Sequence, residues 1–193
     1  MFSGIIKKTG IVKRIISYKN GLRIGIKSNL KLSNKDLGSS INCSGVCLTL
    51  EKIFKKMYFF YLSKETLRTS NFKNIKLNHI INLELPLKYG DKISGHFVQG
   101  HVDITSKLIK KHICGKSWYL YFKMDTNIKK FLIYKSSIAI NGVSLTVSKI
   151  LSKSFLIVVI PHTLKLTNLI NIKKNEIVNC EIDILAKYIK KIK

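Results

Sequence analysis

One ten-residue stretch, Ile41-Asn42-Cys43-Ser44-Gly45-Val46-Cys47-Leu48-Thr49-Leu50, returns later in the chain as Ile138-Ala139-Ile140-Asn141-Gly142-Val143-Ser144-Leu145-Thr146-Val147. The two copies lie 97 residues apart, and five of their ten positions are identical. Each copy carries a turn signal, Ser44-Gly45 in the first and Asn141-Gly142 in the second. The repetition indicates that the chain consists of two related halves.

Three further segments repeat in the same order along the chain. The offset of 97 residues also aligns Thr66–Asn71 with Thr163–Asn168, and the segment 81–85 with the segment 178–182. Near the start of each half, Gly4 aligns with Gly100 at an offset of 96 residues. Four segments in one order and at almost one spacing indicate an internal duplication rather than an accident of composition.

Short strands dominate the pattern of both halves. Gly21–Ser28 and Ser117–Lys123 alternate apolar with polar residues, which is typical of half-buried strands. The β-branched and aromatic run Phe155–Ile160 predicts a strand buried on both faces. Turn signals recur about every eight to twelve residues, which is typical of an all-β barrel or sandwich. We expect asparagine to replace glycine at several positive-φ turns.

Two kinds of segment depart from the strand pattern. Thr66–Asn71 and its copy Thr163–Asn168 predict short helical turns. The end of the chain places Leu185, Tyr188, Ile189 and Ile192 on one face of a predicted helix, with Asp183 as its N-cap. A helix of this length is marginal alone and must pack on something, for which a neighbouring subunit is a candidate.

Composition narrows the class of protein. The chain has 193 residues, 46% of them hydrophobic, which excludes a disordered low-complexity protein. No apolar run approaches the length of a membrane span, and Lys7 and Lys8 interrupt any signal-peptide core, so we expect a cytoplasmic protein. The four cysteines lack the spacing of a zinc site or a disulfide scaffold and are interpreted as reduced thiols.

The net charge of +25 has two interpretations. Arginines number only three among the 35 basic residues, and the lysines are scattered along the chain without forming one stripe. A genome drifting towards A/T-rich codons produces this excess of lysine, isoleucine and asparagine. The alternative is a basic nucleic-acid-binding β-barrel, which needs aromatic residues beside a continuous basic groove. We favour drift and expect no specific nucleic-acid partner.

Several motifs together resemble the riboflavin synthase family, of the trimeric alpha type. The resemblance covers essentially the whole chain and rests on the order and duplication of its motifs. These are Met1-Phe2-Ser3-Gly4-Ile5-Ile6, the twin Gly-Val-Cys/Ser-Leu-Thr segments, Gly95-His96-Phe97-Val98-Gln99-Gly100-His101-Val102-Asp103 and Ile160-Pro161-His162-Thr163-Leu164. The chain departs from the family pattern at Ser44, where Asn is usual, and at Asn78 and Asn175, where Gly is usual.

The resemblance implies an all-β fold of two tandem six-stranded Greek-key barrels with a short C-terminal helix. The first lumazine-binding barrel would span residues 1–97, the second 98–182, and the oligomerisation helix 183–193. The implied reaction is the dismutation of two 6,7-dimethyl-8-ribityllumazine molecules, without metal or cofactor. One molecule gives a four-carbon unit to the other, which yields riboflavin and 5-amino-6-ribitylamino-pyrimidinedione. A homotrimer and an association with lumazine synthase are implied as well.

Three residues are the implied catalytic candidates. Cys47 would line the first pocket, although a buried thiol is often only a core residue. Its repeat partner is Ser144, which would make the two pockets related but not equivalent. His101 is a natural proton shuttle. A hydrogen-bonded histidine at the domain junction is the alternative for His101, and for His96 this structural interpretation is the favoured one.

The resemblance also implies a set of substrate-binding residues. Four of them are threonines at matching places in the two halves, where hydroxyls suit a ribityl chain but also suit strands and helix caps. Asp183 has the further interpretation of a helix cap, and Lys135 rests on the resemblance alone. The full set is Phe2, Gly4, Ile5, Ser40, Thr49, Thr66, Gly100, Val102, Lys135, Thr146, Ile160, Thr163 and Asp183.

One further alternative stays within the family's fold. A non-catalytic lumazine or flavin carrier binds ligand in one barrel and lets the other decay. Both halves here keep the Gly-Val-x-Leu-Thr core, and Cys47 and His101 are present, which favours the enzyme.

Overall fold

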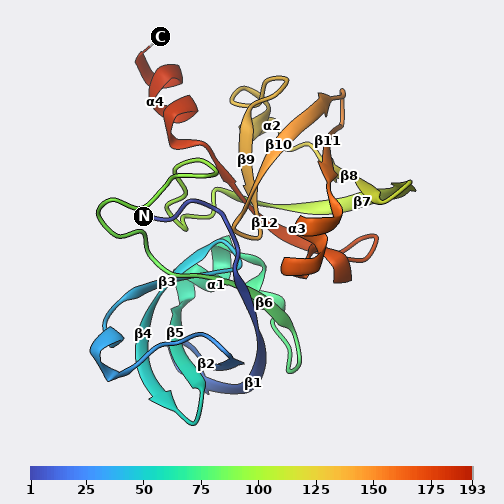
Figure 1. The fold of residues 1–193 in the computed structure, drawn as a ribbon. Helices are drawn as coiled ribbons and strands as arrows, with labels where there is room; N and C mark the ends of the chain where they lie inside the picture. The colour runs from blue at the N-terminus through green and yellow to red at the C-terminus, as the bar shows by residue number, and fades with distance from the viewer. Residues whose placement is uncertain (193) are drawn as a thin grey trace.

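The chain folds into two closed six-stranded antiparallel barrels, as the duplication predicts (Figure 1). The computed structural model describes residues 1–192. In the first barrel the strand order is β1-β2-β5-β4-β3-β6, and the second barrel repeats it with β7 to β12. Because β2 pairs with β5 while β3 pairs with β6, each barrel has Greek-key connections. The strands of the first barrel are β1 (Lys8–Tyr18), β2 (Gly21–Ser28), β3 (Ser40–Cys43), β4 (Val46–Phe54), β5 (Met57–Ser63) and β6 (Ile80–Glu84).

The second barrel follows the same plan. Its strands are β7 (Ile104–Cys114), β8 (Ser117–Lys123), β9 (Ser137–Ile140), β10 (Val143–Ile150), β11 (Ser154–Val159) and β12 (Ile177–Ile182). The helices are α1 (Lys64–Thr69), α2 (Thr126–Lys129), α3 (Pro161–Leu166) and α4 (Ile184–Ile192), with 3-10 turns η1 (Asn34–Asp36), η2 (Asn71–Asn74) and η3 (Asn168–Asn171). None of these helices is long and apolar enough to cross a membrane.

Side chains fill the interior of each barrel. In the second barrel Phe122 and Phe155 are fully buried, and their rings stack with centroids 5.6 Å apart. The first barrel buries Ile24, Phe60 and Leu50 in the same way. Each such side chain contributes roughly 1.5–3 kcal/mol through burial. The barrels are therefore packed cores, and any ligand must bind outside them.

Each barrel begins with a short segment that packs on the other barrel. We call residues 2–6 and 98–102 the leading segments. Ile6 belongs to the core of the second barrel, while Val102 packs against the core of the first. The two segments also pair with each other, because Phe2 N–H donates to Val98 O at 2.7 Å and Val98 N–H donates back at 3.0 Å. The barrels are joined by an exchange of their leading segments.

Buried asparagines also join the barrels about a pseudo-twofold axis. Asn82, on β6, donates from Nδ2 to Asn141 O at 2.9 Å and accepts from Asn168 N–H at 2.6 Å. Asn168 Oδ1 accepts from Asn82 Nδ2 at 2.9 Å and from Asn141 Nδ2 at 3.5 Å. These bonds satisfy buried polar groups of both barrels at once, so they fix how the barrels sit against each other.

Ser44 breaks this symmetry. On the other side of the axis Asn179 donates to Ser44 O at 2.8 Å and accepts from Asn71 N–H at 2.7 Å. Asn71 Oδ1, however, is buried without a hydrogen-bond partner among residues 1–192: Asn179 donates to Ser44 O instead, and Ser44 has no amide to donate to it as Asn141 does to Asn168. Ser44 also adopts a φ of 46°, close to the 47° of Asn141 and in the region that asparagine tolerates better than serine.

We expect Ser44→Asn to raise the free energy of unfolding by about 1 kcal/mol, because it offers a donor to a buried orphan acceptor and relieves the positive φ. Urea unfolding of the wild type and the variant measures the change. The matched control is Asn141→Ser, which creates the same defect on the other side and should lower stability. An unchanged or lower stability of Ser44→Asn would contradict this account.

Candidate active site

Three predicted site residues share the outer face of the β3–β4 hairpin. Ser40 and Thr49 pair directly across the two strands, and Cys47 lies two residues from Thr49 on the same face. Leu48 and Leu50 alternate with them and point into the filled barrel. We call Ser40, Cys47 and Thr49 the first face. A ligand here would lie against the outside of the barrel.

The second leading segment lies directly over the first face. Cys47 N–H donates to Gly100 O at 2.8 Å. A Cβ at Gly100 would stand 2.7 Å from the Cβ of Cys47, and the φ of Gly100 is +79°, so only glycine allows this approach. The contact places His101, whose side chain is exposed, next to the first face.

The second barrel repeats this arrangement with the first leading segment. Ser144 and Thr146 lie on the outer face of the β9–β10 hairpin, where Thr146 pairs with Ser137. Ser144 N–H donates to Gly4 O at 2.8 Å, and a Cβ at Gly4 would stand 2.6 Å from that of Ser144. We call Ser137, Ser144 and Thr146 the second face. The duplicated sequence therefore produces two similar faces, each bordered by the other barrel's leading segment.

Two buried carboxylates bind the leading segments. Glu84, at the end of β6, accepts from Ser3 N–H at 2.8 Å and from Gly4 N–H at 3.1 Å. Glu181, on β12, accepts from the backbone N–H groups of residues 99, 100 and 101 at 2.6, 2.9 and 3.1 Å. Burial raises the pKa of Glu181 to about 7, an effect that the three N–H donors oppose. Burial likewise raises the pKa of Glu84.

His96 enters the second face, a place that the sequence did not predict for it. Its Nδ1 lies 2.7 Å from Ser144 Oγ, and the buried Nε2 has no hydrogen-bond partner among the residues that the structure describes. The backbone N–H of His96 also donates to Ser3 O at 3.2 Å, so His96 orders the linker as well. Burial lowers the pKa of His96, although the nearby charge of Asp183 acts in the opposite direction. The first face has no equivalent residue, because His96 precedes the repeat.

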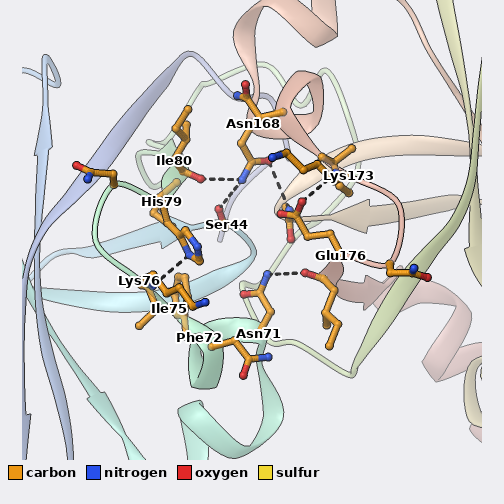
Figure 2. Close-up of a pocket in the computed structure, with 18 residues that line it drawn as sticks. Ser44, Asn71, Phe72, Ile75, Lys76, His79, Ile80, Asn168, Lys173 and Glu176 are labelled. Carbon is orange, nitrogen blue, oxygen red and sulfur yellow. Dashed lines mark hydrogen bonds between the residues drawn. The ribbon is translucent and has the colours of Figure 1, made fainter.

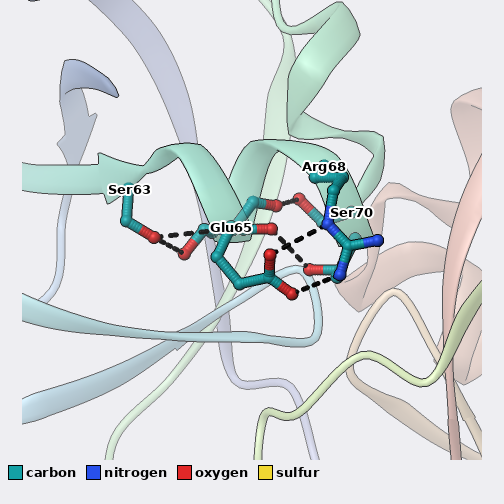
Figure 3. Close-up of polar contacts among 6 residues, drawn as sticks. Ser63, Glu65, Arg68 and Ser70 are labelled. Atoms are coloured by element: carbon teal, nitrogen blue, oxygen red, sulfur yellow. Dashed lines mark hydrogen bonds and ion pairs between the residues drawn. The ribbon is translucent and has the colours of Figure 1, made fainter. Parts of the chain in front are cut away.

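The threonines that follow the two faces lie on short helices. Thr66 is in α1, where its N–H donates to Ser63 Oγ at 3.1 Å and its hydroxyl lies 3.0 Å from the same oxygen (Figure 3). Ser70 Oγ donates to Thr66 O at 2.6 Å. Thr163 occupies the matching place in α3, but Ile160 replaces Ser63, and Pro161 begins that helix. At this helix the first barrel therefore has a capping hydroxyl that the second barrel lacks.

Four further predicted site residues lie outside the two faces. Lys135 has a φ of +68°, which costs a lysine conformational energy that its counterpart Gly38 avoids. Asp183 caps α4 through its Oδ1, which accepts from Leu185 N–H at 3.0 Å. Phe2 is fully buried between the barrels, whereas Ile5 is 37% exposed. No hydrogen bond joins these four residues to one another within residues 1–192.

Two hollows of about 700 Å³ each are lined by other residues than the six that form the two faces. One opens between the barrels and is lined by asparagines together with His79, Lys173 and Glu176 (Figure 2). The other lies beside the linker, among several lysines, and Ile5 is the predicted site residue that reaches it. Among residues 1–192, no group of three or more His, Cys, Asp or Glu side chains is arranged to hold a metal ion.

His96 predicts a loss of stability on acidification. Because its folded-state pKa lies below its ordinary value of 6.5, the unfolded chain binds the proton more tightly, and stability falls as the pH drops through about 6.5. His96→Gln removes this titration. We expect the wild type to lose stability relative to His96→Gln between about pH 7.5 and 5.5, measured by urea unfolding at each pH. A constant difference between the two proteins would contradict a buried, neutral His96.

Comparison with known proteins agrees with the duplication. The family model described as "Lumazine binding domain" matches residues 3–86 and again residues 99–183. Riboflavin synthase of Photobacterium leiognathi is 35% identical over 193 residues, which are 100% of this chain and 88% of that protein. Riboflavin synthase of Chlamydia pneumoniae is 38% identical over 97% of this chain and 92% of its own length. That of Bacillus subtilis is 31% identical over 97% of this chain and 87% of its own.

Solved structures agree with the fold. LumP complexed with 6,7-dimethyl-8-(1'-D-ribityl) lumazine superposes with a TM-score of 0.81 at 23% identity and covers 94% of this chain and 98% of its own. LumP complexed with riboflavin gives a TM-score of 0.84 at 22% identity, with 94% of this chain and 99% of its own covered. With both lumazine-binding domains matched and the relatives aligned along nearly their whole length, this chain belongs to the riboflavin synthase family.

Proposed function

We propose that this chain is a riboflavin synthase, a transferase that dismutates two molecules of 6,7-dimethyl-8-ribityllumazine. One molecule gives its four-carbon unit to the other, and the products are riboflavin and 5-amino-6-ribitylamino-pyrimidinedione. The two products together contain all the atoms of the two substrates, so the reaction needs no oxidant or reductant. The observation that carries the proposal is the pair of similar faces, both of which keep their polar side chains and their bordering segment.

A reaction between two copies of one molecule requires two similar binding places that hold the copies in register. Such positioning contributes on the order of 7–11 kcal/mol to the acceleration of a bimolecular reaction. The polar groups of the faces suit the polar edge and the ribityl chain of the substrate, with Ser40, Thr49 and Thr66 in one half and Thr146 and Thr163 in the other. The barrels supply rigid backing for both.

The two faces differ where the reaction requires different roles. The first face presents the Cys47 thiol, and the exposed His101 follows Gly100, which lies directly over Cys47. An imidazole at this place suits proton transfer from the acidic 7-methyl group. The second face presents the Ser144 hydroxyl hydrogen-bonded to a desolvated His96 imidazole. Lys135 and Asp183 complete the second half as binding residues, and Phe2 and Ile160 shape its surroundings. Donor and acceptor molecules would then occupy chemically distinct places.

Substitution at the first face tests the proposal. We expect the wild type to form riboflavin from the lumazine without added metal or cofactor, followed by absorbance and fluorescence. His101→Ala should lower kcat by about 100-fold, within the usual range for a lost proton shuttle. Cys47→Ala should also lower turnover, with little loss of stability in either variant.

Two exposed residues of the β7–β8 hairpin are matched controls. His112→Ala and Cys114→Ala make the same chemical changes away from both faces and should keep wild-type turnover. Unchanged rates in Cys47→Ala and His101→Ala would remove those two assignments. Tight binding of the lumazine without turnover by the wild type would identify a carrier instead of an enzyme.

We further propose a cytoplasmic homotrimer in which faces of neighbouring subunits meet. The amphipathic helix α4 supports this assembly. One side of it is fixed to the second barrel, where Ala186 packs against the core and Lys187 Nζ forms an ion pair with Asp103 at 2.7 Å. The other side of α4 leaves Leu185, Tyr188, Ile189 and Ile192 between 55% and 85% exposed, and the helix projects away from both barrels (Figure 1). Exposed apolar surface of this kind is buried on association. Because both enzymes handle the same lumazine, association with lumazine synthase belongs to the proposal too.

Charge placed on the apolar side of α4 tests the assembly. We expect Ile189→Asp to convert a trimer into monomers in sedimentation equilibrium, because burial of a carboxylate in an apolar interface is unfavourable. Lys190→Asp is the control, since it puts the same charge on the same helix outside the apolar side. A wild-type monomer, or an equal effect of both variants, would contradict assembly through this side of α4.

A further inference from the structure

Glu84 and Glu181 accept hydrogen bonds mainly from backbone N–H groups. The Glu181 carboxylate, 2% exposed, accepts three consecutive N–H groups, those of Gln99, Gly100 and His101. Glu84, 7% exposed, accepts the N–H groups of Ser3, Gly4 and Ile5 in the other leading segment, and also the Ser3 hydroxyl at 2.9 Å. Hydrogen bonds to a charged acceptor are about twice as strong as neutral ones, so each carboxylate fixes a short stretch of main chain.

Each carboxylate binds a leading segment that borders the face of the opposite barrel. Glu181 is on β12 of the second barrel, but the segment that it binds runs over Cys47 on the first face. Glu84 is on β6 of the first barrel, and its segment runs over Ser144 on the second face. The border of each face is therefore anchored from the opposite barrel.

We propose that Glu84 and Glu181 are positioning residues that act crosswise, so that each determines ligand binding at the face of the barrel to which it does not belong. This inference rests on the proposed function, because it assumes that the two faces bind the lumazine. Neither carboxylate touches the substrate in this scheme. Glu181 acts through Gly100 and His101, and Glu84 acts through Gly4.

Removing one carboxylate should loosen only the segment that it holds. In Glu181→Gln the side-chain amide keeps one acceptor oxygen, but its NH2 group would face N–H donors. Because Oε1 accepts from Gln99 N–H and Oε2 accepts from the N–H groups of Gly100 and His101, at least one of the three backbone N–H groups then loses its acceptor. The segment must shift to recover partners, and a displacement of about 1 Å can cost up to 100-fold at a site that depends on orientation.

The experiment compares Glu181→Gln with Glu84→Gln in the full-length protein. The probe is an 8-ribityllumazine with a 7-oxo group, which lacks the reactive 7-methyl, titrated by NMR. Amide signals of Thr49 and Thr66 report on the first face, and those of Thr146 and Thr163 on the second. We expect Glu181→Gln to raise Kd at the first face by about tenfold or more and to leave the second unchanged. Glu84→Gln should give the reverse pattern.

Turnover and hydrogen exchange add readouts that a loss of general stability would not reproduce. In Glu181→Gln the amides of residues 99–101 should exchange faster, while those of residues 3–5 keep their protection. The value of kcat should fall even where the melting temperature shows that the protein remains folded. If Glu181→Gln fails to fold, Gly100→Ala displaces the same segment from Cys47. Its control is Gly115→Ala on the β7–β8 hairpin, where the glycine also has a positive φ but open space around its Cβ.

The crosswise role would be overturned if Kd rose at the face of the barrel that carries the substituted carboxylate. It would also be overturned if Kd rose equally at both faces or at neither face. Normal wild-type turnover combined with such a result contradicts only this inference. A wild-type protein that neither binds the probe nor converts the lumazine contradicts the proposed function itself. The two failures are therefore distinguishable.

Discussion

The close approach of Gly100 to Cys47, and of Gly4 to Ser144, is the constraint on which the rest of the structure depends. At both places a backbone carbonyl accepts the N–H of the residue beneath it, and no side chain larger than hydrogen fits. The contacts fix two chain crossings, and the crossings send Ile6 and Val102 into each other's barrels. The core of each barrel is thus completed by the leading segment of the other barrel.

Duplication alone would give two identical sites, whereas the chemistry of a dismutation needs a donor and an acceptor. The structure produces the difference from small changes on a shared frame. Cys47 becomes Ser144, Ser63 becomes Ile160, and Gly38 becomes Lys135 in a left-handed conformation. His96 adds a buried imidazole to the second face only, because the linker passes that face after the first repeat has ended. The frame stays symmetric while the reactive groups do not.

Strand alternation and turn spacing predicted an all-β barrel or sandwich, and local patterns also predicted the helical turns and the C-terminal helix. The repeat predicted two related halves, while the two six-stranded barrels were implied by the family resemblance. The sequence also predicted asparagine at positive-φ turns, as at Asn78 and Asn175. The exchange of leading segments was not predictable, since Ile6 and Val102 present the same apolar pattern whichever core they enter. Glu84 and Glu181 were overlooked, although an acidic residue at the same place in two buried strands was a visible signal. The structure agrees with the favoured interpretation of His96 as a hydrogen-bonded histidine at the domain junction, but its partner Ser144 was not predictable because the contact is tertiary.

The central claim is that one chain carries two unequal binding faces for the same heterocycle. Isothermal titration calorimetry with the unreactive 7-oxo lumazine tests it most directly, because it counts bound molecules without requiring turnover. The account predicts two molecules bound per protomer, in two steps of different affinity. A single molecule per protomer, or two equivalent molecules with one shared affinity, would contradict it.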